Sequence, residues 1–199
     1  MNVLIFGGFL GSGKTTALMQ LARYIVDSSE TDNPNKVMIL ENEIGEVGID
    51  DAFLRGGGFK VDNLFAGCAC CTVSGELVSA AAGIERDYNP EWLVVETTGL
   101  AYPKKIQENL MDAMKLKARI AVLVDASRWQ RLHIPMENLF KGQIVGSDAV
   151  VINKADLVDG DTMGTVESDI RAYEPDVNIF RVSALEPVSE EVWKGVLGK

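Results

Sequence analysis

A glycine-rich stretch near the N-terminus has the residue types that bind nucleotide phosphates. Residues 8–15 read Gly-Phe-Leu-Gly-Ser-Gly-Lys-Thr and follow the apolar run at residues 3–6. Glycines let backbone N–H groups approach phosphate oxygens, and a helix beginning at Lys14 would add its positive N-terminal end. The lysine can reach the β- and γ-phosphates, and the Thr15 hydroxyl can ligate Mg²⁺. The alternative is a glycine-rich turn with a structural role only. The expected phosphate-binding residues are Gly8, Gly11, Ser12, Gly13, Lys14, Thr15 and Thr16.

A second motif, Asn-Lys-Ala-Asp at residues 153–156, predicts that the base is guanine. The Asp156 carboxylate can accept two hydrogen bonds from guanine, and adenine cannot supply those donors in the same arrangement. We expect Asn153 to brace the loop and the base edge, and the Lys154 stem to cover the ring. A backbone N–H of Ser183 or Ala184 can close the base pocket. Alone the motif is a weak four-residue match, but it follows both a phosphate loop and a buried strand, so we expect GTP and GDP as ligands.

The segment at residues 92–99 ends in Glu96 and, three residues later, Gly99. An acidic residue at such a strand end helps to hold Mg²⁺, and the glycine N–H can meet the γ-phosphate. The alternative is an incidental glutamate. Leu100 follows the glycine, so no glutamine orients the attacking water there, and the group that does so is not identified. The expected catalytic residues are Lys14, Thr15, Glu96 and Gly99.

Three cysteines, Cys68, Cys70 and Cys71, are the only ones in the chain. Clustered thiolates could hold Zn²⁺, Co²⁺ or Cu(I) and leave a fourth position open for exchange. The alternatives are small buried core residues or a redox pair. The odd count argues against a disulfide framework and favours a reducing, cytoplasmic location.

Residues 41–50 form an acidic, glycine-containing segment after an expected strand. Beside a phosphate site, such a loop can sense the γ-phosphate and Mg²⁺. The alternative is an ordinary solvated turn. Two single residues are less informative: Asp125 is expected to be structural or to lie just behind the site, and His133 is expected on the surface, with a metal role as the alternative.

Alternating apolar and amphipathic segments predict an α/β fold with a mainly parallel seven-stranded sheet flanked by helices, as in P-loop NTPases. The expected strands lie near residues 2–7, 36–41, 61–65, 91–96, 118–125, 148–153 and 178–182. The expected helices lie near residues 14–27, 73–88, 103–116, 136–145, 162–174 and 188–197.

The chain has 199 residues and a formal net charge of −10, which predicts one domain over residues 1–199 without a separate C-terminal domain. An acidic chain is a poor partner for nucleic acid or for anionic membranes. Neither a signal peptide nor a membrane span is indicated.

In combination, these motifs resemble the CobW-like GTPases, relatives of the nickel-insertion GTPases HypB and UreG. The resemblance depends on residues 8–15, 41–50, 67–71, 96–99 and 153–156 in that order, and it spans nearly the whole chain. The Glu-Asn-Glu-x-Gly-Glu segment with Gly-Cys-x-Cys-Cys is its most specific part. Many such proteins continue into a C-terminal domain, whereas this sequence stops at Lys199, which predicts a separate partner or a homodimer.

The resemblance implies a Mg²⁺-dependent GTPase that delivers a transition metal, or that helps to mature a metalloenzyme or a corrinoid protein. The implied transition-metal set is Cys68, Cys70, Cys71, Glu41, Glu43 and Glu46, with Zn²⁺ or Co²⁺ as the expected ion. One rival is a GTP-dependent regulatory module in which the metal is a structural staple or a sensor. A second rival, a small-molecule kinase, is disfavoured by the guanine motif.

Overall fold

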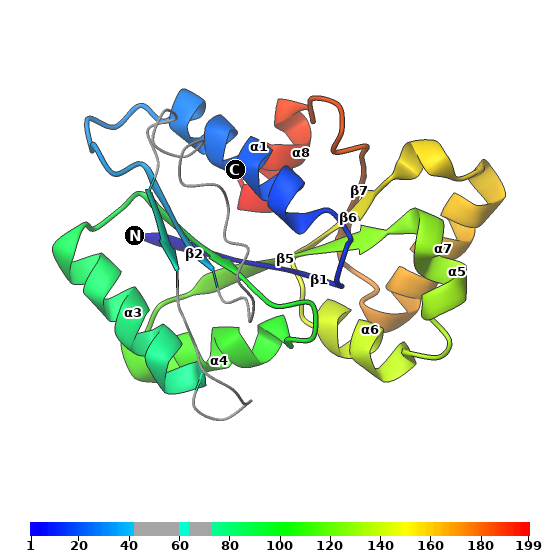
Figure 1. Cartoon of the computed structure of the whole chain (residues 1–199), viewed down its shortest axis with the longest axis horizontal. Coiled ribbons are helices and arrows are strands. Elements are labelled where there is room, and N and C mark those ends of the chain that lie inside the picture. Colours follow the sequence, from blue (N-terminus) through cyan, green and yellow to red (C-terminus); the bar gives the residue numbers. More distant parts are fainter. Residues whose placement is uncertain (42–59, 64–72) are drawn as a thin grey trace.

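Parallel strands form one central sheet in the computed structural model, which describes residues 1–41, 60–63 and 73–199 (Figure 1). The strand order is β3-β2-β4-β1-β5-β6-β7, and each neighbouring pair is parallel. The strands are β1 (Asn2–Gly8), β2 (Val37–Glu41), β3 (Lys60–Asn63), β4 (Trp92–Glu96), β5 (Ala118–Asp125), β6 (Ala149–Asn153) and β7 (Asn178–Arg181). The predicted α/β class and mainly parallel sheet are confirmed.

Helices cover both faces of this sheet (Figure 1). One face carries α1 (Lys14–Ser28) and α8 (Glu190–Leu197). The opposite face carries α3 (Val73–Asp87), α4 (Pro103–Met114), α5 (Trp129–Leu132), α6 (Glu137–Ile144) and α7 (Gly160–Tyr173). Two short 3-10 helices, η1 (Ala126–Arg128) and η2 (Ala155–Leu157), follow β5 and β6. No helix in the described ranges has the length and apolar character that a membrane span requires.

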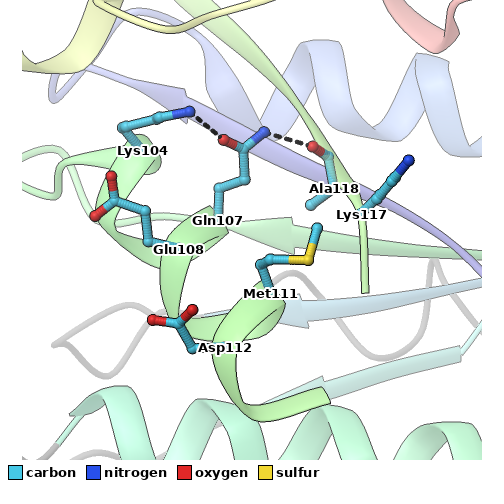
Figure 2. Close-up of a pocket in the computed structure, with 7 residues that line it drawn as sticks. All are labelled: Lys104, Gln107, Glu108, Met111, Asp112, Lys117 and Ala118. Atoms are coloured by element: carbon cyan, nitrogen blue, oxygen red, sulfur yellow. Dashed lines mark hydrogen bonds between the residues drawn. The ribbon is translucent and has the colours of Figure 1, made fainter. Parts of the chain in front are cut away.

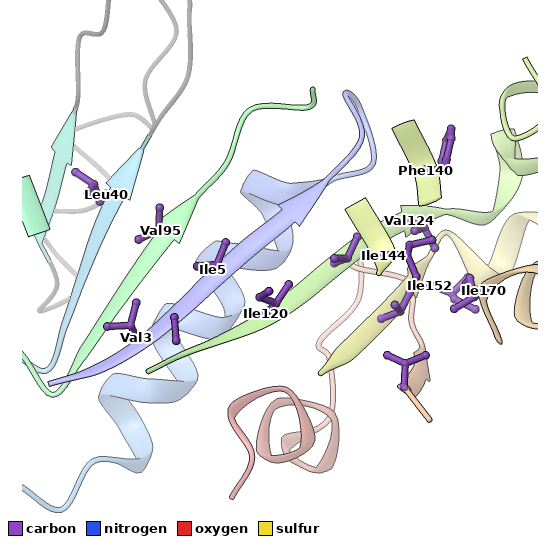
Figure 3. Packing of buried hydrophobic residues seen from close by; sticks show 14 of the residues in the cluster. Val3, Ile5, Leu40, Val95, Ile120, Val124, Phe140, Ile144, Ile152 and Ile170 are labelled. Atoms are coloured by element: carbon purple, nitrogen blue, oxygen red, sulfur yellow. The ribbon is translucent and has the colours of Figure 1, made fainter. Parts of the chain in front are cut away.

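Burial on both faces explains why the central strands are apolar throughout. Every residue of β2, β4 and β6 is buried, including the polar residue that ends each strand. On one face, strand side chains such as Ile5 and Ile120 pack in a cluster with Phe140 of α6 and Ile170 of α7 (Figure 3). On the other, α1 presents an apolar stripe at helical spacing. Its buried members are Ala17, Leu18, Leu21, Ala22 and Ile25.

The element ranges agree with those predicted from the sequence, with a few informative differences. Helix α7 begins at Gly160 rather than at residue 162, because the Asp159 side chain accepts a hydrogen bond from Thr162 N at 2.8 Å and caps the first turn. The short helices η1, α5 and η2 were not predicted. They are too short for hydrophobic periodicity to indicate them.

The strand order places β1 between β4 and β5, so four strand ends that carry motif residues lie along one edge of the sheet. Gly8, Glu96, Asp125 and Asn153 are the last residues of β1, β4, β5 and β6. Asp125 and Asn153 are direct neighbours in the strand register. Ligands of open parallel sheets bind at this carboxyl edge, where loops from different strands meet.

Asn2 and the side chain of Lys199 both approach Glu91 at the opposite, amino edge. Asn2 N donates to Glu91 O at 2.8 Å, and Glu91 immediately precedes β4. Lys199 Nζ lies 3.9 Å from Glu91 Oε1 and 5.8 Å from the centre of the Trp92 ring.

Candidate functional site

The segment between β1 and α1 has a backbone that glycine alone adopts without strain. Gly8 has a φ of 143°, and a Cβ there would collide with Leu123 O of the neighbouring strand β5. Gly13 has a φ of 95° and is the N-cap residue of α1, and a Cβ there would lie 2.5 Å from Asn153 Nδ2. Both glycines are therefore required by close approach of backbone and side chains. Residues 9–13, hereafter the phosphate loop, are held at the carboxyl edge of the sheet.

Asn153 and Lys154 of the predicted guanine motif bind this loop directly. Asn153 Nδ2 donates to Ser12 O at 2.8 Å, and Lys154 Nζ donates to Gly11 O at 3.2 Å. Asn153 Oδ1 accepts hydrogen bonds from Lys154 N and from Ala184 N, each at 2.8 Å. The Asn153 side chain is buried, and it holds Ser12 of the phosphate loop and Ala184 together.

The direction of these carbonyl groups fixes the direction of the loop's N–H groups. In a trans peptide the C=O and the following N–H point in opposite directions. A loop whose carbonyls are drawn toward Asn153 and Lys154 therefore turns amide hydrogens of the same peptides to the other side. One of them is used internally, because Ser12 N donates to Phe9 O at 3.1 Å. The other, the Gly13 N–H, is directed away from Asn153 at the start of α1, where a helix N-terminus suits an anion.

Asp125 joins the guanine motif to the residues after β5. Its Oδ2 accepts from Lys154 Nζ and from Arg128 Nε, each at 2.7 Å, and its Oδ1 accepts from Ser127 N and Oγ at 3.0 and 2.6 Å. Burial tends to raise the pKa of Asp125, but hydrogen bonds from Lys154, Ser127 and Arg128 outweigh it and hold the pKa below its ordinary value. The carboxylate is therefore ionised at neutral pH, and its hydrogen bonds hold Lys154 and Arg128 beside the phosphate loop.

The first turn of α1 supplies the remaining polar groups of the phosphate motif. Lys14 is the first residue of the helix and is buried, whereas Thr15 and Thr16 are exposed. Ser12 is fully buried, and its Oγ has no hydrogen-bond partner among the described residues. Such an unsatisfied buried hydroxyl is uncommon and fits a site whose polar partner is a ligand.

Two carboxylates end the neighbouring strands β2 and β4 at the same edge. Glu41 and Glu96 are partners in the strand register, and their exposed fractions are 6% and 5%. Glu96 is also the register partner of Phe6, two residues before the end of β1. Carboxylate and hydroxyl oxygens are the donors that Mg²⁺ prefers, so Glu96 and Thr15 fit a magnesium site chemically.

Gly99 is packed against the phosphate loop. A Cβ on this residue would lie 2.6 Å from Leu10 N and 3.0 Å from Leu10 Cα, so only glycine permits the approach. Its carbonyl accepts from Gln143 Nε2 at 2.9 Å, and Gln143 is 2% exposed. Sequence reasoning missed Gln143. The available signal was a glutamine directly before the apolar pair Ile144 and Val145 at the end of α6.

The expected base side of the site is built from the loops after β6 and β7. Asp156 lies in η2 and is exposed, and Ala155 N donates to Val182 O at 3.1 Å. Gln20 of α1 donates to Ala184 O at 2.8 Å, which ties the second loop to the helix behind the phosphate loop. Residues 153–156 and 183–184 are therefore brought together, as the sequence predicted.

Several predicted site residues lie outside the described residues. These are Glu43, Glu46, Cys68, Cys70 and Cys71. Within the ranges that the structure describes, no three His, Cys, Asp or Glu side chains are grouped so that they could hold a metal ion. The alternative metal role of His133 is not supported among these residues. Its Nε2 lies within hydrogen-bonding distance of the Tyr173 hydroxyl, at 2.6 Å, and its ring stacks on Trp129. The His133 side chain is 17% exposed, so it is partly buried rather than fully exposed on the surface.

A pocket of about 490 Å³ beside α4 is separate from this site (Figure 2). It is lined by Met111 and by the first residue of β5, Ala118, which lies at the opposite end of that strand from Asp125. Its central Gln107 is already engaged, accepting from Lys104 Nζ at 2.7 Å and donating to Ala118 O at 2.6 Å. The Gln107 side chain is therefore already paired within the protein.

The fold and this edge of the sheet define a nucleotide-binding domain of the P-loop class. Four features follow one another along the chain and converge on one edge of the sheet. They are the phosphate loop, Glu96 at the end of β4, Gly99, and the Asn-Lys-Ala-Asp motif at residues 153–156. The chain belongs to the CobW/HypB/UreG nucleotide-binding domain family, whose sequence model matches residues 2–181.

Known proteins support this placement. The chain is 29% identical over 210 residues to the zinc chaperone CobW of Pseudomonas aeruginosa, covering 88% of this chain and 54% of the relative. It is 33% identical over 154 residues to the zinc chaperone YeiR of Escherichia coli, covering 75% and 45%. The crystal structure of HypB from Helicobacter pylori in complex with nickel matches all of this chain and 84% of that one, with a TM-score of 0.63 and 22% identity. The chain spans about half the length of the curated relatives it matches.

Proposed function

We propose that this domain binds GTP and GDP with Mg²⁺, hydrolyses GTP, and uses the nucleotide state to control a transition metal destined for a client protein. The observation that carries the nucleotide part is the hydrogen bonding of Asn153. It ties the guanine-reading segment to Ser12 of the phosphate loop and to Ala184 of the adjacent loop. Base and phosphate ends of one ligand site are thereby held in fixed relation, which suits recognition of a whole nucleotide.

Each residue of the site has a separate task in this proposal. Backbone N–H groups of the phosphate loop and the Lys14 ammonium bind the phosphate oxygens, and the Gly99 N–H meets the γ-phosphate. Thr15 and Glu96 would hold Mg²⁺, directly or through water. Bound there, the ion would offset charge on the phosphate oxygens during hydrolysis. Asp156 accepts hydrogen bonds from guanine.

The metal part of the proposal rests on Cys68, Cys70 and Cys71, supplemented by Glu41, Glu43 and Glu46. Thiolates select zinc or cobalt over magnesium. Two similar proteins are named zinc chaperones, which favours zinc as the cargo. The client would be a metalloenzyme or a corrinoid protein, and a homodimer could complete the docking surface.

A short route could couple the two parts. Glu41, one of the proposed metal-site residues, is the register partner of Glu96, the proposed magnesium residue. A change in nucleotide that moves the end of β4 therefore acts on the neighbouring end of β2. This adjacency supports a switch in which the bound nucleotide changes the affinity for the transition metal, and the metal changes the affinity for the nucleotide.

The substitution Asp156→Asn tests the guanine assignment. An amide at this position cannot accept both hydrogen bonds from guanine, but it can donate one to the C2 carbonyl of xanthine. We expect GTP affinity to fall by about 100-fold, the scale of losing charge-assisted hydrogen bonds, and XTP affinity to rise. Both are measured by equilibrium titration with fluorescent nucleotides.

The matched control is Asp161→Asn, an exposed aspartate five residues further along the chain. It changes the net charge equally and should leave both affinities unaltered. An Asp156→Asn protein that still prefers GTP over XTP would show that the base is read elsewhere, and the guanine assignment would fail.

A further inference from the structure

Arg128 contacts the phosphate loop, although it belongs to none of the motifs that define the site. It ends η1, directly after β5. Its Nη2 donates to Leu10 O at 2.7 Å, and its Nε donates to Asp125 Oδ2 at 2.7 Å. With both ends of the guanidinium held, the group has a fixed orientation that a lysine could not reproduce.

Gly11 provides the space for this contact. A Cβ on Gly11 would lie 3.0 Å from Arg128 Nη2 and 3.2 Å from Nη1, so the guanidinium lies against the glycine backbone. Gly11 also has a φ of 72°, which a larger residue adopts only at a cost. The loop is therefore shaped to receive this particular side chain.

Holding the Leu10 carbonyl orients the next amide. Leu10 C=O and Gly11 N–H belong to one trans peptide and point in opposite directions. Because Arg128 draws the carbonyl to its side, the Gly11 N–H is directed to the other side. Arg128 thus extends to Leu10 the same restraint that Lys154 applies at Gly11 and Asn153 applies at Ser12.

The restrained peptide lies at the Gly99 end of the loop. The place of a Cβ on Gly99 is 2.6 Å from Leu10 N, so the two segments touch there. In the proposed function, Gly99 meets the γ-phosphate. The amide that Arg128 orients is therefore at the terminal-phosphate end of the site, and the β-phosphate end depends on residues nearer to α1.

We propose that Arg128 is a positioning residue that allows the domain to distinguish GTP from GDP, by directing the Gly11 N–H toward the terminal phosphate. This inference rests on the proposed guanine-nucleotide function. It assigns a selective role to Arg128: its loss weakens binding of the triphosphate and slows hydrolysis, and it leaves diphosphate binding nearly unchanged.

The test compares Arg128→Met with Arg131→Met in the whole chain. Arg131 is an exposed arginine of the adjacent helix α5, so its replacement changes the net charge equally without touching the phosphate loop. Dissociation constants are measured for a non-hydrolysable GTP analogue and for GDP, together with kcat and KM. Thermal unfolding without nucleotide verifies that each variant is folded.

For Arg128→Met we expect about tenfold weaker binding of the GTP analogue, the scale of one charge-assisted hydrogen bond, with GDP binding changed by less than about twofold. The value of kcat should fall as well. Arg128→Lys should be intermediate, since one ammonium cannot hold both Leu10 O and the Asp125 carboxylate. Arg131→Met should match the unaltered protein.

Two results would overturn the inference. If Arg128→Met weakens both nucleotides equally, the residue only supports the loop in general; if it weakens neither, the contact with Leu10 is inconsequential. If the proposed function itself is wrong, the result is distinguishable from both of these, because the unaltered protein would then bind neither GTP nor GDP.

Discussion

Oδ2 of Asp125 accepts hydrogen bonds from two cations that come from different loops. Lys154 belongs to the guanine motif and Arg128 to the segment after β5, and both also reach carbonyls of the phosphate loop. A buried carboxylate costs several kcal/mol unless it is paired, and here the pairing is twofold. The same residue therefore neutralises its own charge and fixes two side chains that shape the phosphate loop.

The substitution Asp125→Asn should destabilise the fold by about 2 kcal/mol at pH 7, because two partly buried cationic donors, Arg128 and Lys154, lose their charged acceptor. The pKa of Asp125 is lowered in the folded protein. Its contribution is therefore present above the unfolded pKa of about 3.9 and is lost as pH falls through the lower folded pKa. Urea unfolding from pH 7 down to pH 3 measures this difference.

Asp112→Asn is the control, since this carboxylate on α4 is exposed and its replacement should change the free energy of unfolding by less than about 0.5 kcal/mol. The free energy of unfolding of Asp125→Asn is compared with that of the unaltered protein. If the difference stays constant as the pH falls below 4, the charge of Asp125 does not contribute to stability and only its shape does.

At the scale of elements, the loops that follow β1, β4 and β5 converge because β1 lies between β4 and β5 in the sheet. The loop after β4 brings Gly99 against Leu10, and helix α6 holds that loop through the hydrogen bond from Gln143. The same helix packs Phe140 against Phe9, with ring centres 5.4 Å apart. Helix α6 therefore supports the phosphate loop and the switch glycine together.

Gly99→Ala should disturb this junction, since the new methyl group would meet Leu10 N at 2.6 Å. We expect a loss of about 1–3 kcal/mol in the free energy of unfolding, typical of overpacking, and a lower rate of GTP hydrolysis. Urea unfolding and steady-state phosphate release measure the two effects.

The matched control is Gly83→Ala in α3, where a Cβ meets no atom within 4 Å. It should raise stability by about 0.5–1 kcal/mol, because alanine favours the helix more than glycine does. A Gly99→Ala protein with normal stability and normal hydrolysis would contradict the close packing of the two loops.

Most elements of this fold could be predicted because their signals are local. Buried apolar strands and helical periodicity give the ranges, and the glycine-rich and Asn-Lys-Ala-Asp motifs locate both ends of the site. Arg128 and Gln143 could not be found in this way. Arg128 reaches the phosphate loop through Leu10, and Gln143 holds Gly99. The partners in each contact are more than 40 residues apart in the sequence, and no spacing in the sequence encodes either contact.

At the scale of the whole molecule, three cationic side chains lie at or beside the phosphate loop of an acidic chain. The chain carries a formal net charge of −10. Nevertheless Arg128 and Lys154 contact the phosphate loop and Lys14 begins the helix behind it. The acidic balance of the chain as a whole disfavours a nucleic acid as its ligand.

The proposed coupling of nucleotide and metal predicts that zinc affinity depends on which nucleotide is bound. We expect a difference of about tenfold between the protein with a non-hydrolysable GTP analogue and the protein with GDP, within the usual range of coupling energies. Competition titration against a chromophoric zinc chelator measures both affinities.

Replacing Cys68, Cys70 and Cys71 with serine separates cargo from structural metal. A chaperone predicts a folded protein that no longer binds or transfers zinc, whereas a structural staple predicts loss of folding. Equal zinc affinities in the two nucleotide states would exclude the coupling, whichever variant folds.

The contacts of Asn2 and of the Lys199 side chain with Glu91 place both ends of this domain on the side from which another molecule can be attached. The ends lie at the amino edge of the sheet, and a seven-residue strand such as β1 separates that edge from the phosphate loop by about 20 Å. A surface anchor, a fluorescent label or a fused protein at either end therefore leaves the nucleotide edge uncovered. A short flexible linker could also join the two ends, so new ends could be opened elsewhere without cutting the loops that form the site.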